Sequence, residues 1–354
     1  MATDRYAGLD VHLESCTLAV MGSSGRRMFS RVLETNGRVL VDAVRGIGGR
    51  VHLCLEEGAQ SAWLYEILEP HVEELVVTMP GESQGQKDDL RDAWARADEV
   101  RLGTFRTRVY KAPKHMTGLR SAGRAYRMAT RDVVRVKNRL KAVLSSRGLQ
   151  SDSSVYDPDA RSQWLKQLPS GHRELAEWLG RELDELVPLR DEAEEWLHKE
   201  AKTHPIIRTL STAPGLGPIR TAQLVAIVVS PHRFRTSRQF WSYCGFSIVR
   251  RSSSDWVREK SGQWVRGQVH QTRGLSRQRQ PVLKAIFKGA ATTVIMQLPN
   301  DPLHASYQRA LKAGIKPNLA KLTLARRIAA IVLSMWKHEE VYDPERIKTT
   351  TDES

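Results

Sequence analysis

The sequence predicts an α/β domain at the amino terminus, followed by a helical middle segment and a mainly helical carboxy-terminal region. Apolar runs that alternate with a helical pattern between residues 6 and 80 predict strands and helices that share one sheet, with at least one parallel strand pair. Residues 117–147 repeat apolar side chains every three or four positions, which predicts a long helix. A chain of 354 residues is long enough for two or three domains.

We expect four segments: residues 1–107, 108–204, 205–342 and a disordered polar tail at 343–354. In the first segment, apolar and β-branched runs predict strands at 6–12, 16–20, 51–55 and 75–80, the first two forming a hairpin. Helical patterns lie between them at 38–44 and 61–68.

Asp10 lies inside the first apolar run, where an unpaired charge would cost several kcal/mol, roughly. A metal ion would remove that cost, as would a paired arginine or a capped turn. Glu56 and Glu57 end a buried strand, and because strand side chains alternate, only one of them can face Asp10.

Asp89 and Asp92 are three residues apart in a helical stretch and therefore share one face. Near a helix amino terminus, Asp88 and Asp89 are also favoured by the helix dipole alone. Taken with Asp10 and a strand-end glutamate, they predict a hard-oxygen site suited to Mg²⁺. Two such ions about 3.5–4 Å apart would activate a phosphodiester for in-line displacement.

The formal charge of +15 and the pI of 9.9 indicate a polyanionic partner. Residues 108–150 hold 12 Lys and Arg against one acid, and residues 231–284 hold 12 against two, whereas residues 173–200 hold 4 against 10. Such separation favours nucleic acid, bound through its phosphates. The candidate binding residues are Arg124, Arg127, Arg131, Arg135, Lys137, Arg250, Arg251 and Arg258.

Three distant cysteines in apolar settings (Cys16, Cys54 and Cys244) indicate buried thiols in a reducing cytosol. No secretory h-region opens the chain, and no apolar run reaches the roughly 20 residues that a membrane helix needs. We therefore expect an intracellular protein without a membrane partner.

Two features of the carboxy-terminal region bear on function. Gly215 and Gly217 form a turn before a helix at 219–229, and such a turn presents backbone N–H groups to an anion or simply makes a tight connection. Ser252, Ser253 and Ser254 follow two arginines; by composition they indicate a turn that bonds phosphates, or a nucleophile activated from elsewhere in the fold.

A loop at 151–158 separates the long basic helix from an acidic helix that carries Leu179 and Leu183 and contains Pro188. The pair predicts either a coiled-coil hairpin for contact between protomers or simple packing within a domain. Further helices are expected at 283–295 and 317–337.

Motifs in the first segment resemble the RNase H-like, RuvC-like catalytic domain of the DEDD transposases of the insertion-sequence one-ten family. They are Gly-Leu-Asp-Val-His at 8–12, a glutamate followed six residues later by Trp63, and Lys-x-Asp-x-x-Asp-Ala at 87–93. The resemblance implies a catalytic, metal-binding tetrad of Asp10, Glu57, Asp89 and Asp92. Ala59 and Gln60 stand where the family has Thr-Gly, which leaves Glu56 as an alternative to Glu57.

The carboxy-terminal region resembles the transposase domain of the same family through Pro-Gly-Leu-Gly at 214–217, Tyr-Cys-Gly-Phe at 243–246 and the serines that follow. In that family a serine bonds covalently to DNA, and counting from Gly245 places it at Ser253, with Ser252 and Ser254 as alternatives. The later Ser261 is too far from Gly245.

The resemblance implies a DNA recombinase of a mobile element, guided by a structured bridge RNA that pairs with target and donor DNA. We also expect a homo-oligomer, a dimer assembling to a tetramer, in the bacterial cytoplasm and on the nucleoid when bound to DNA. The rival interpretations are a Holliday-junction or RNase H-like nuclease and a nucleic-acid-binding scaffold without catalysis.

Overall fold

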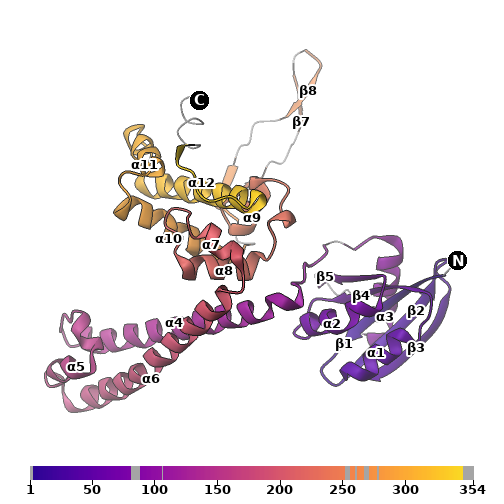
Figure 1. Ribbon diagram of the computed structural model, residues 1–354, viewed down its shortest axis with the longest axis horizontal. Helices are drawn as coiled ribbons and strands as arrows, with labels where there is room; N and C mark the ends of the chain where they lie inside the picture. Colours follow the sequence, from indigo (N-terminus) through magenta and orange to yellow (C-terminus); the bar gives the residue numbers. More distant parts are fainter. Residues whose placement is uncertain are drawn as a thin grey trace. The chain divides into compact units, whose positions relative to one another are not determined.

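The computed structural model describes residues 3–80, 88–105, 107–251, 256–259, 261–266, 271–276 and 279–345, without the side chains of 249–251, 257, 266 and 271–273. The chain divides into two compact units, of which unit 1 ends at Thr117 and unit 2 begins at Gly118 (Figure 1). The predicted tail lies largely outside the described residues, since these end at 345.

Unit 1 is built on a mixed five-stranded sheet with the strand order β3-β2-β1-β4-β5. β1 pairs antiparallel with β2 and parallel with β4, and β4 pairs parallel with β5. The predicted hairpin and the predicted parallel pair are therefore confirmed. The strand bounds are β1 Asp4–Val11, β2 Ser15–Gly22, β3 Arg27–Glu34, β4 Arg50–Glu56 and β5 Glu74–Thr78.

Helices cover both faces of this sheet (Figure 1). The core on one face joins Leu40 and Val44 of α1 (Gly37–Arg45) with Leu64 and Leu68 of α2 (Ser61–Leu68). On the other face, α3 (Asp89–Leu102) buries Ala93, Trp94 and Ala97 against β1 and β2. Short 3₁₀ turns at Glu69–His71 and Lys114–Met116 complete the unit.

Gly8 lets α3 approach β1 at close range. A Cβ atom at this position would lie 2.0 Å from the Ala93 carbonyl oxygen and 2.5 Å from the Ala97 nitrogen. Both atoms are backbone, so they cannot move aside as a flexible side chain would. The glycine therefore sets the depth at which α3 rests on the sheet.

The sequence did not indicate β3. This strand is an edge strand whose side chains are mostly exposed, and Arg27, Arg31 and Glu34 interrupt its apolar residues. Edge strands of this kind carry charge that discourages pairing with other chains, and the same charge hides the apolar pattern on which strand prediction depends.

In unit 2, α4 (Thr117–Ser145) and α6 (Ser170–Ala201) run side by side in opposite directions, with α5 (Pro158–Leu165) at their tip (Figure 1). Their shared core includes Val136 and Leu140 of α4 and Leu179 and Leu183 of α6. The predicted long helix is confirmed, and α6 continues through Pro188. The expected loop instead contains a 3₁₀ turn at Ser153–Tyr156 and the start of α5.

The rest of unit 2 is mainly helical and packs around buried Phe240, Phe246 and Phe287. The predicted helices at 219–229, 283–295 and 317–337 correspond to α8, α10 and α12, whereas α7, α9 and α11 were not indicated. The helices are α7 (Pro205–Leu210), α8 (Pro218–Val228), α9 (Ser237–Cys244), α10 (Pro281–Gln297), α11 (Pro302–Lys312) and α12 (Pro317–His338), with a 3₁₀ turn at Pro231–Arg233.

Four short strands form two antiparallel pairs in unit 2, β6 with β9 and β7 with β8. Their bounds are β6 Ile248–Arg251, β7 Trp256–Arg258, β8 Trp264–Arg266 and β9 Gln271–Leu275. In the described part of the chain, no helix combines the length and the apolar character that crossing a bilayer requires.

Candidate active site

Asp10 occupies the carboxyl end of β1, one residue before the strand ends at Val11. Only 14 % of its side chain is exposed. Burial is the main reason that the pKa of its carboxyl lies above the ordinary value; the charges of Asp89 and Asp92 add to this effect and His12 opposes it. Asp10 is thus a largely buried carboxylate with two other acids nearby.

Asp89 and Asp92 lie in the first turn of α3. The helix begins there because the Asp88 side chain caps it, accepting hydrogen bonds from the Leu90 and Arg91 backbone N–H groups at 3.0 and 3.2 Å. The positive end of the helix dipole favours the acids at this position. Asp89 Oδ1 lies 3.0 Å from His12 Nε2 beside the end of β1, and the charges of Asp89 and Asp92 both raise the pKa of Asp10.

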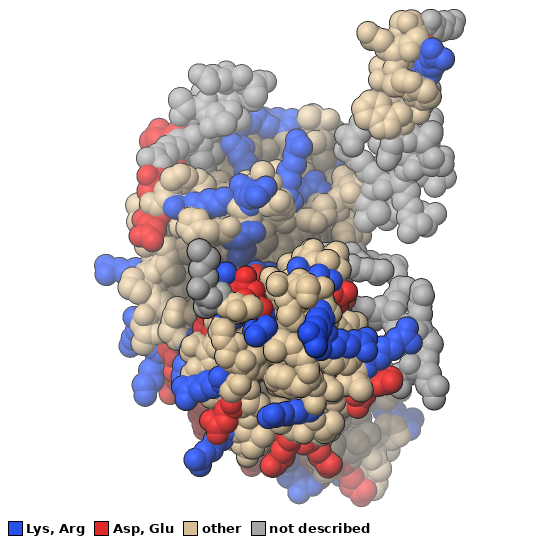
Figure 2. All heavy atoms as spheres, turned by 90° about the vertical axis from the view of Figure 1, so that its right-hand side faces the viewer, with Lys and Arg blue, Asp and Glu red and all other residues tan. Residues whose placement is uncertain are grey.

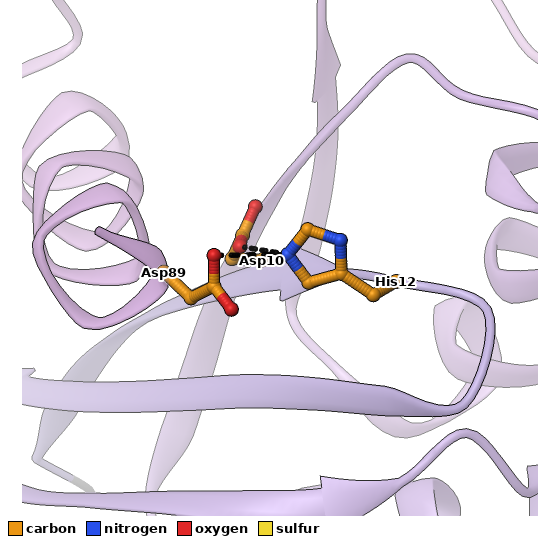
Figure 3. Close-up of side chains that lie close together, drawn as sticks. All are labelled: Asp10, His12 and Asp89. Atoms are coloured by element: carbon orange, nitrogen blue, oxygen red, sulfur yellow. Dashed lines mark ion pairs between the residues drawn. The ribbon is translucent and has the colours of Figure 1, made fainter. Parts of the chain in front are cut away.

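His12 joins the two acids, although the sequence did not single it out as a site residue. Its Nε2 atom lies 3.0 Å from Asp10 Oδ2 and 3.0 Å from Asp89 Oδ1 (Figure 3). The backbone holds the residue on both sides, since its N–H donates to the Ser15 carbonyl and its own carbonyl accepts from Thr35 Oγ1. The sequence signal that could have identified His12 is its spacing from Asp10, because residues two apart in a strand point to the same face.

These residues fit a divalent cation. Asp10, His12 and Asp89 each offer a ligand atom, and the three atoms lie within 4.8 Å of one another. Asp10 Oδ2 and His12 Nε2 are buried, and they contact each other at 3.0 Å. Buried polar atoms at this distance are costly unless a proton or a cation lies between them.

Glu57 lies elsewhere in the unit's network of charges. Its Oε2 atom accepts a hydrogen bond from Ser61 Oγ at 2.9 Å and forms an ion pair with Lys111. Lys111 also donates to Ser61 Oγ at 2.7 Å, and only 7 % of its side chain is exposed. Glu57 does not belong to the group formed by Asp10, His12 and Asp89. No sequence signal indicated Lys111, which is 54 positions away.

Glu56, the alternative to Glu57, is also paired. The pairing of Leu9 with Leu55 puts it next to Asp10 across the parallel strands. Its Oε1 atom accepts a hydrogen bond at 2.9 Å from Arg96 of α3, which also binds Glu99. Each glutamate therefore pairs with a positively charged side chain. Which of the two glutamates joins the metal site stays a prediction.

Ser253 and its alternatives Ser252 and Ser254 lie outside the described residues, as do the side chains of Arg250 and Arg251. Arg258 of β7 is exposed, and its Nε donates to the Gly262 carbonyl at 3.2 Å. The nucleophile therefore rests on the sequence alone.

The candidate nucleic-acid residues of α4 differ in their surroundings. Arg124 and Arg131 are exposed. Arg135 pairs with Asp132 at 2.8 Å, and Lys137 Nζ lies 4.7 Å from the centre of the Tyr156 ring. Burial, followed by the charges of Arg131 and Arg124, lowers the pKa of Arg127.

The glycine turn before α8 is held by the packing of unit 2. Gly215 has φ +74, and a Cβ there would lie 2.4 Å from the Ala290 carbonyl oxygen. Its own carbonyl accepts a hydrogen bond from Arg220 at 2.7 Å. Gly217 caps α8 and has open space around it. Close packing against Ala290 therefore explains why position 215 is a glycine. The open space at Gly217 leaves the amino terminus of α8 accessible to a ligand.

Comparison with known families agrees with this arrangement. Residues 7–147 match the DEDD model of the IS110 transposases, described as Transposase, and residues 207–308 match the Transposase IS116/IS110/IS902 family. Unit 1 thus has the RNase H-like fold that the DEDD domain implies. No curated protein matches the chain.

The fold and the two matches define the class of protein: a transposase, which is an enzyme that breaks and rejoins DNA strands. The chain belongs to the IS110 family, the insertion-sequence one-ten family that the sequence motifs resemble. The DEDD transposases use a divalent metal, and the group of Asp10, His12 and Asp89 is a candidate site for it.

Proposed function

We propose that this transposase is an RNA-guided recombinase of a mobile insertion sequence, which cuts and rejoins DNA through a covalent phosphoserine intermediate. One observation carries the catalytic part of the proposal. Asp89 Oδ1 and Asp10 Oδ2 each lie 3.0 Å from His12 Nε2, where β1 ends and α3 begins. Acids distant in sequence converge there within the region that matches the DEDD model.

The residues proposed to hold Mg²⁺ are Asp10, Glu57, Asp89 and Asp92. When bound, the metal supplies Lewis-acid activation of a DNA phosphate. The chain itself fixes the acids: the β1 hydrogen bonds hold Asp10, and the Asp88 cap orients the first turn of α3. Glu57 would have to give up its ion pair with Lys111 in order to bind the metal.

Ser253 is the proposed nucleophile. Its Oγ attacks the phosphorus, an Oγ–P bond forms, and the bond from phosphorus to one deoxyribose oxygen breaks. The serine proton passes to a base, and the departing sugar oxygen takes up a proton. The phosphoserine ester conserves the bond for transfer to a new strand, which attack by water would not do.

The proposed partners are a structured bridge RNA and target and donor DNA. Support comes from the basic residues of α4 and of the 231–284 region, which suit contacts to phosphate. Figure 2 shows one face of the molecule, on which Lys and Arg side chains stand among acidic ones. Long basic stretches of sequence, with no recognised motif for reading bases, suit a protein that leaves sequence choice to RNA pairing.

We further propose a three-part layout, with a RuvC-like catalytic domain, a coiled-coil middle and a carboxy-terminal transposase domain, in a dimer that assembles to a tetramer. The pairing of α4 with α6 supports the middle part. α6 also exposes large apolar side chains that a second protomer would cover: Leu175, Trp178, Leu189 and Trp196.

Trapping of the covalent intermediate tests the proposal. Full-length protein, purified with its co-purifying RNA, is incubated with labelled DNA and Mg²⁺, and adducts that survive denaturation are counted. We expect Asp92→Asn to lower cleavage at least about 10²-fold while RNA binding persists. Ser253→Ala should bind RNA and DNA normally and form no adduct.

Each variant has a matched control. Asp88→Asn keeps a good helix cap beside the site, and Ser261→Ala removes a serine nearby in sequence; both should react like wild type. Full cleavage by Asp92→Asn would overturn the assignment of the acids. If Ser253→Ala still forms adducts, the nucleophile is Ser252 or Ser254. If the wild-type protein gives nicks without adducts, the enzyme is a nuclease and not a recombinase.

A further inference from the structure

The geometry around His12 Nε2 goes beyond an ordinary hydrogen bond. A ring nitrogen carries at most one proton, yet this atom lies 3.0 Å from Asp10 Oδ2 and 3.0 Å from Asp89 Oδ1. One N–H can point well at one acceptor only. Figure 3 shows the ring directed between the two carboxylates rather than toward either one.

The same distances match the edges of a coordination shell. Neighbouring ligands of an octahedral ion with bonds of about 2.1 Å lie about 3.0 Å apart. His12 Nε2 and Asp10 Oδ2 are both buried, and they lie in contact with each other rather than with solvent. Three ligand atoms within 4.8 Å of one another complete a set of one nitrogen and two oxygens.

The His12 backbone is fixed as a ligand position requires. Its N–H donates to the Ser15 carbonyl at 2.9 Å, and its carbonyl accepts from Thr35 Oγ1 at 2.9 Å. Thr35 Oγ1 also contacts Cys16 Sγ at 3.3 Å. The turn after β1 and the residue that follows β3 therefore fix the backbone of His12 beside the site.

We propose that His12 binds the metal through Nε2, alongside Asp10 and Asp89, and that the site consequently takes Mn²⁺ more tightly than Mg²⁺. Mg²⁺ takes oxygen ligands and prefers to keep its waters, whereas first-row transition ions accept imidazole nitrogen readily. This inference rests on the proposed function for the presence of a metal, and it adds a nitrogen ligand to a tetrad made of carboxylates.

Electron spin echo envelope modulation tests it directly. Full-length protein is loaded with Mn²⁺ alone, and the spectrum is examined for the ¹⁴N modulation of a directly bound imidazole. We expect that modulation in wild type and its loss in His12→Gln. His52→Gln is the control, because His52 also lies between two carboxylates, 3.5 Å from Asp4 and 3.6 Å from Glu74, outside the group.

Affinity gives the second readout. His12→Gln should weaken Mn²⁺ binding by about 10-fold or more and Mg²⁺ binding by less. His12→Asp should restore binding without ¹⁴N modulation and shift the preference toward Mg²⁺. Circular dichroism and melting in EDTA confirm that each variant folds.

Three outcomes would overturn the inference: Mn²⁺ bound without ¹⁴N modulation, His12→Gln with wild-type affinity for Mn²⁺, or no binding of Mn²⁺ at millimolar concentration. Its failure can be told apart from that of the proposed function. If the protein forms DNA adducts but shows no ¹⁴N coupling, the recombinase function is supported and the His12 ligand is rejected. If it shows ¹⁴N coupling but forms no adduct, the His12 ligand is supported and the recombinase function is rejected.

Discussion

Lys111 shows how one side chain can control a candidate catalytic acid. It forms an ion pair with Glu57 and donates to Ser61 Oγ, while only 7 % of its side chain is exposed. A hydrogen bond from Val109 to the Val77 carbonyl of β5 holds its chain segment against the sheet. In this position the lysine competes with any cation for Glu57.

Lys111→Met tests that competition. With 36 % of its side chain exposed, Glu57 keeps part of its solvation, so we expect unfolding to become easier by about 1–2 kcal/mol. If Glu57 binds the metal, Mg²⁺ affinity should rise, because a competing positive charge has gone, and Glu57→Gln should lower it. Denaturant titration and calorimetry measure the two effects.

Lys114→Met is the control, because 83 % of that lysine's side chain is exposed and its contact with Glu66 is 3.4 Å long. It should change stability by less than about 0.5 kcal/mol. Additive effects of Lys111→Met and Glu57→Gln would contradict the pairing, since coupled residues deviate by roughly 0.5–3 kcal/mol. If neither substitution changes the affinity for Mg²⁺, Glu56 rather than Glu57 is the glutamate that binds the metal.

At the scale of elements, the site depends on how deeply α3 rests on β1. Asp10 belongs to the strand and Asp89 to the helix, so the gap between their carboxylates follows the distance between the two elements. Gly8 sets that distance, because a Cβ there would meet two backbone atoms of α3. The glycine lies two residues before Asp10 and faces the same helix.

Gly8→Ala should therefore damage both stability and metal binding. Backbone atoms 2.0 and 2.5 Å away force α3 outward, at a cost of about 1–3 kcal/mol or more. Asp89 moves with the helix, so Mn²⁺ and Mg²⁺ affinity should fall together. Thermal melting and calorimetry report the two quantities.

Gly22→Ala in β2 is the matched control, since the nearest atom to a Cβ there is Arg5 Nη1 at 3.8 Å. It should melt within a few degrees of wild type, as expected for a change below about 1 kcal/mol. A Gly8→Ala protein with normal melting and normal metal affinity would show that α3 does not set the site.

For the whole molecule, the question is whether the acids of one protomer serve the serine of another. The acids lie in unit 1, and Ser253 belongs to the chain of unit 2. The exposed apolar side chains of α6 offer a surface for protomer contact. An even-numbered oligomer would then build each site from two chains.

Mixing two inactive variants tests that arrangement. Ser253→Ala and Asp10→Asn proteins are combined in equal amounts, allowed to exchange subunits, and assayed for DNA adducts. Random pairing makes half of the dimers mixed, each with one intact composite site, so about a quarter of wild-type adducts should return. Each variant alone should give none. A mixture as inactive as its components, despite verified subunit exchange, would place both groups in one protomer.

Local sequence patterns by themselves determined much of this protein. The strand–helix–strand order of unit 1, the long helix α4, the acids of the first α3 turn and the family all follow from short-range signals. These signals are local because strand alternation and helical spacing act within a few residues. These signals did not reveal edge strand β3, the short strands β6 to β9 or helices α5, α7, α9 and α11, because these elements are short or rich in charge.

Only the tertiary structure decided which side chains meet. Asp89 is brought to Asp10 and His12 by the packing of α3 on β1, and Lys111 reaches Glu57 across 54 positions of sequence. In the same way, Arg96 of α3 donates a hydrogen bond to Glu56, 40 positions away in the sequence. Such pairings depend on the register of parallel strands and on one glycine's lack of a Cβ, which a one-dimensional pattern of residues does not encode.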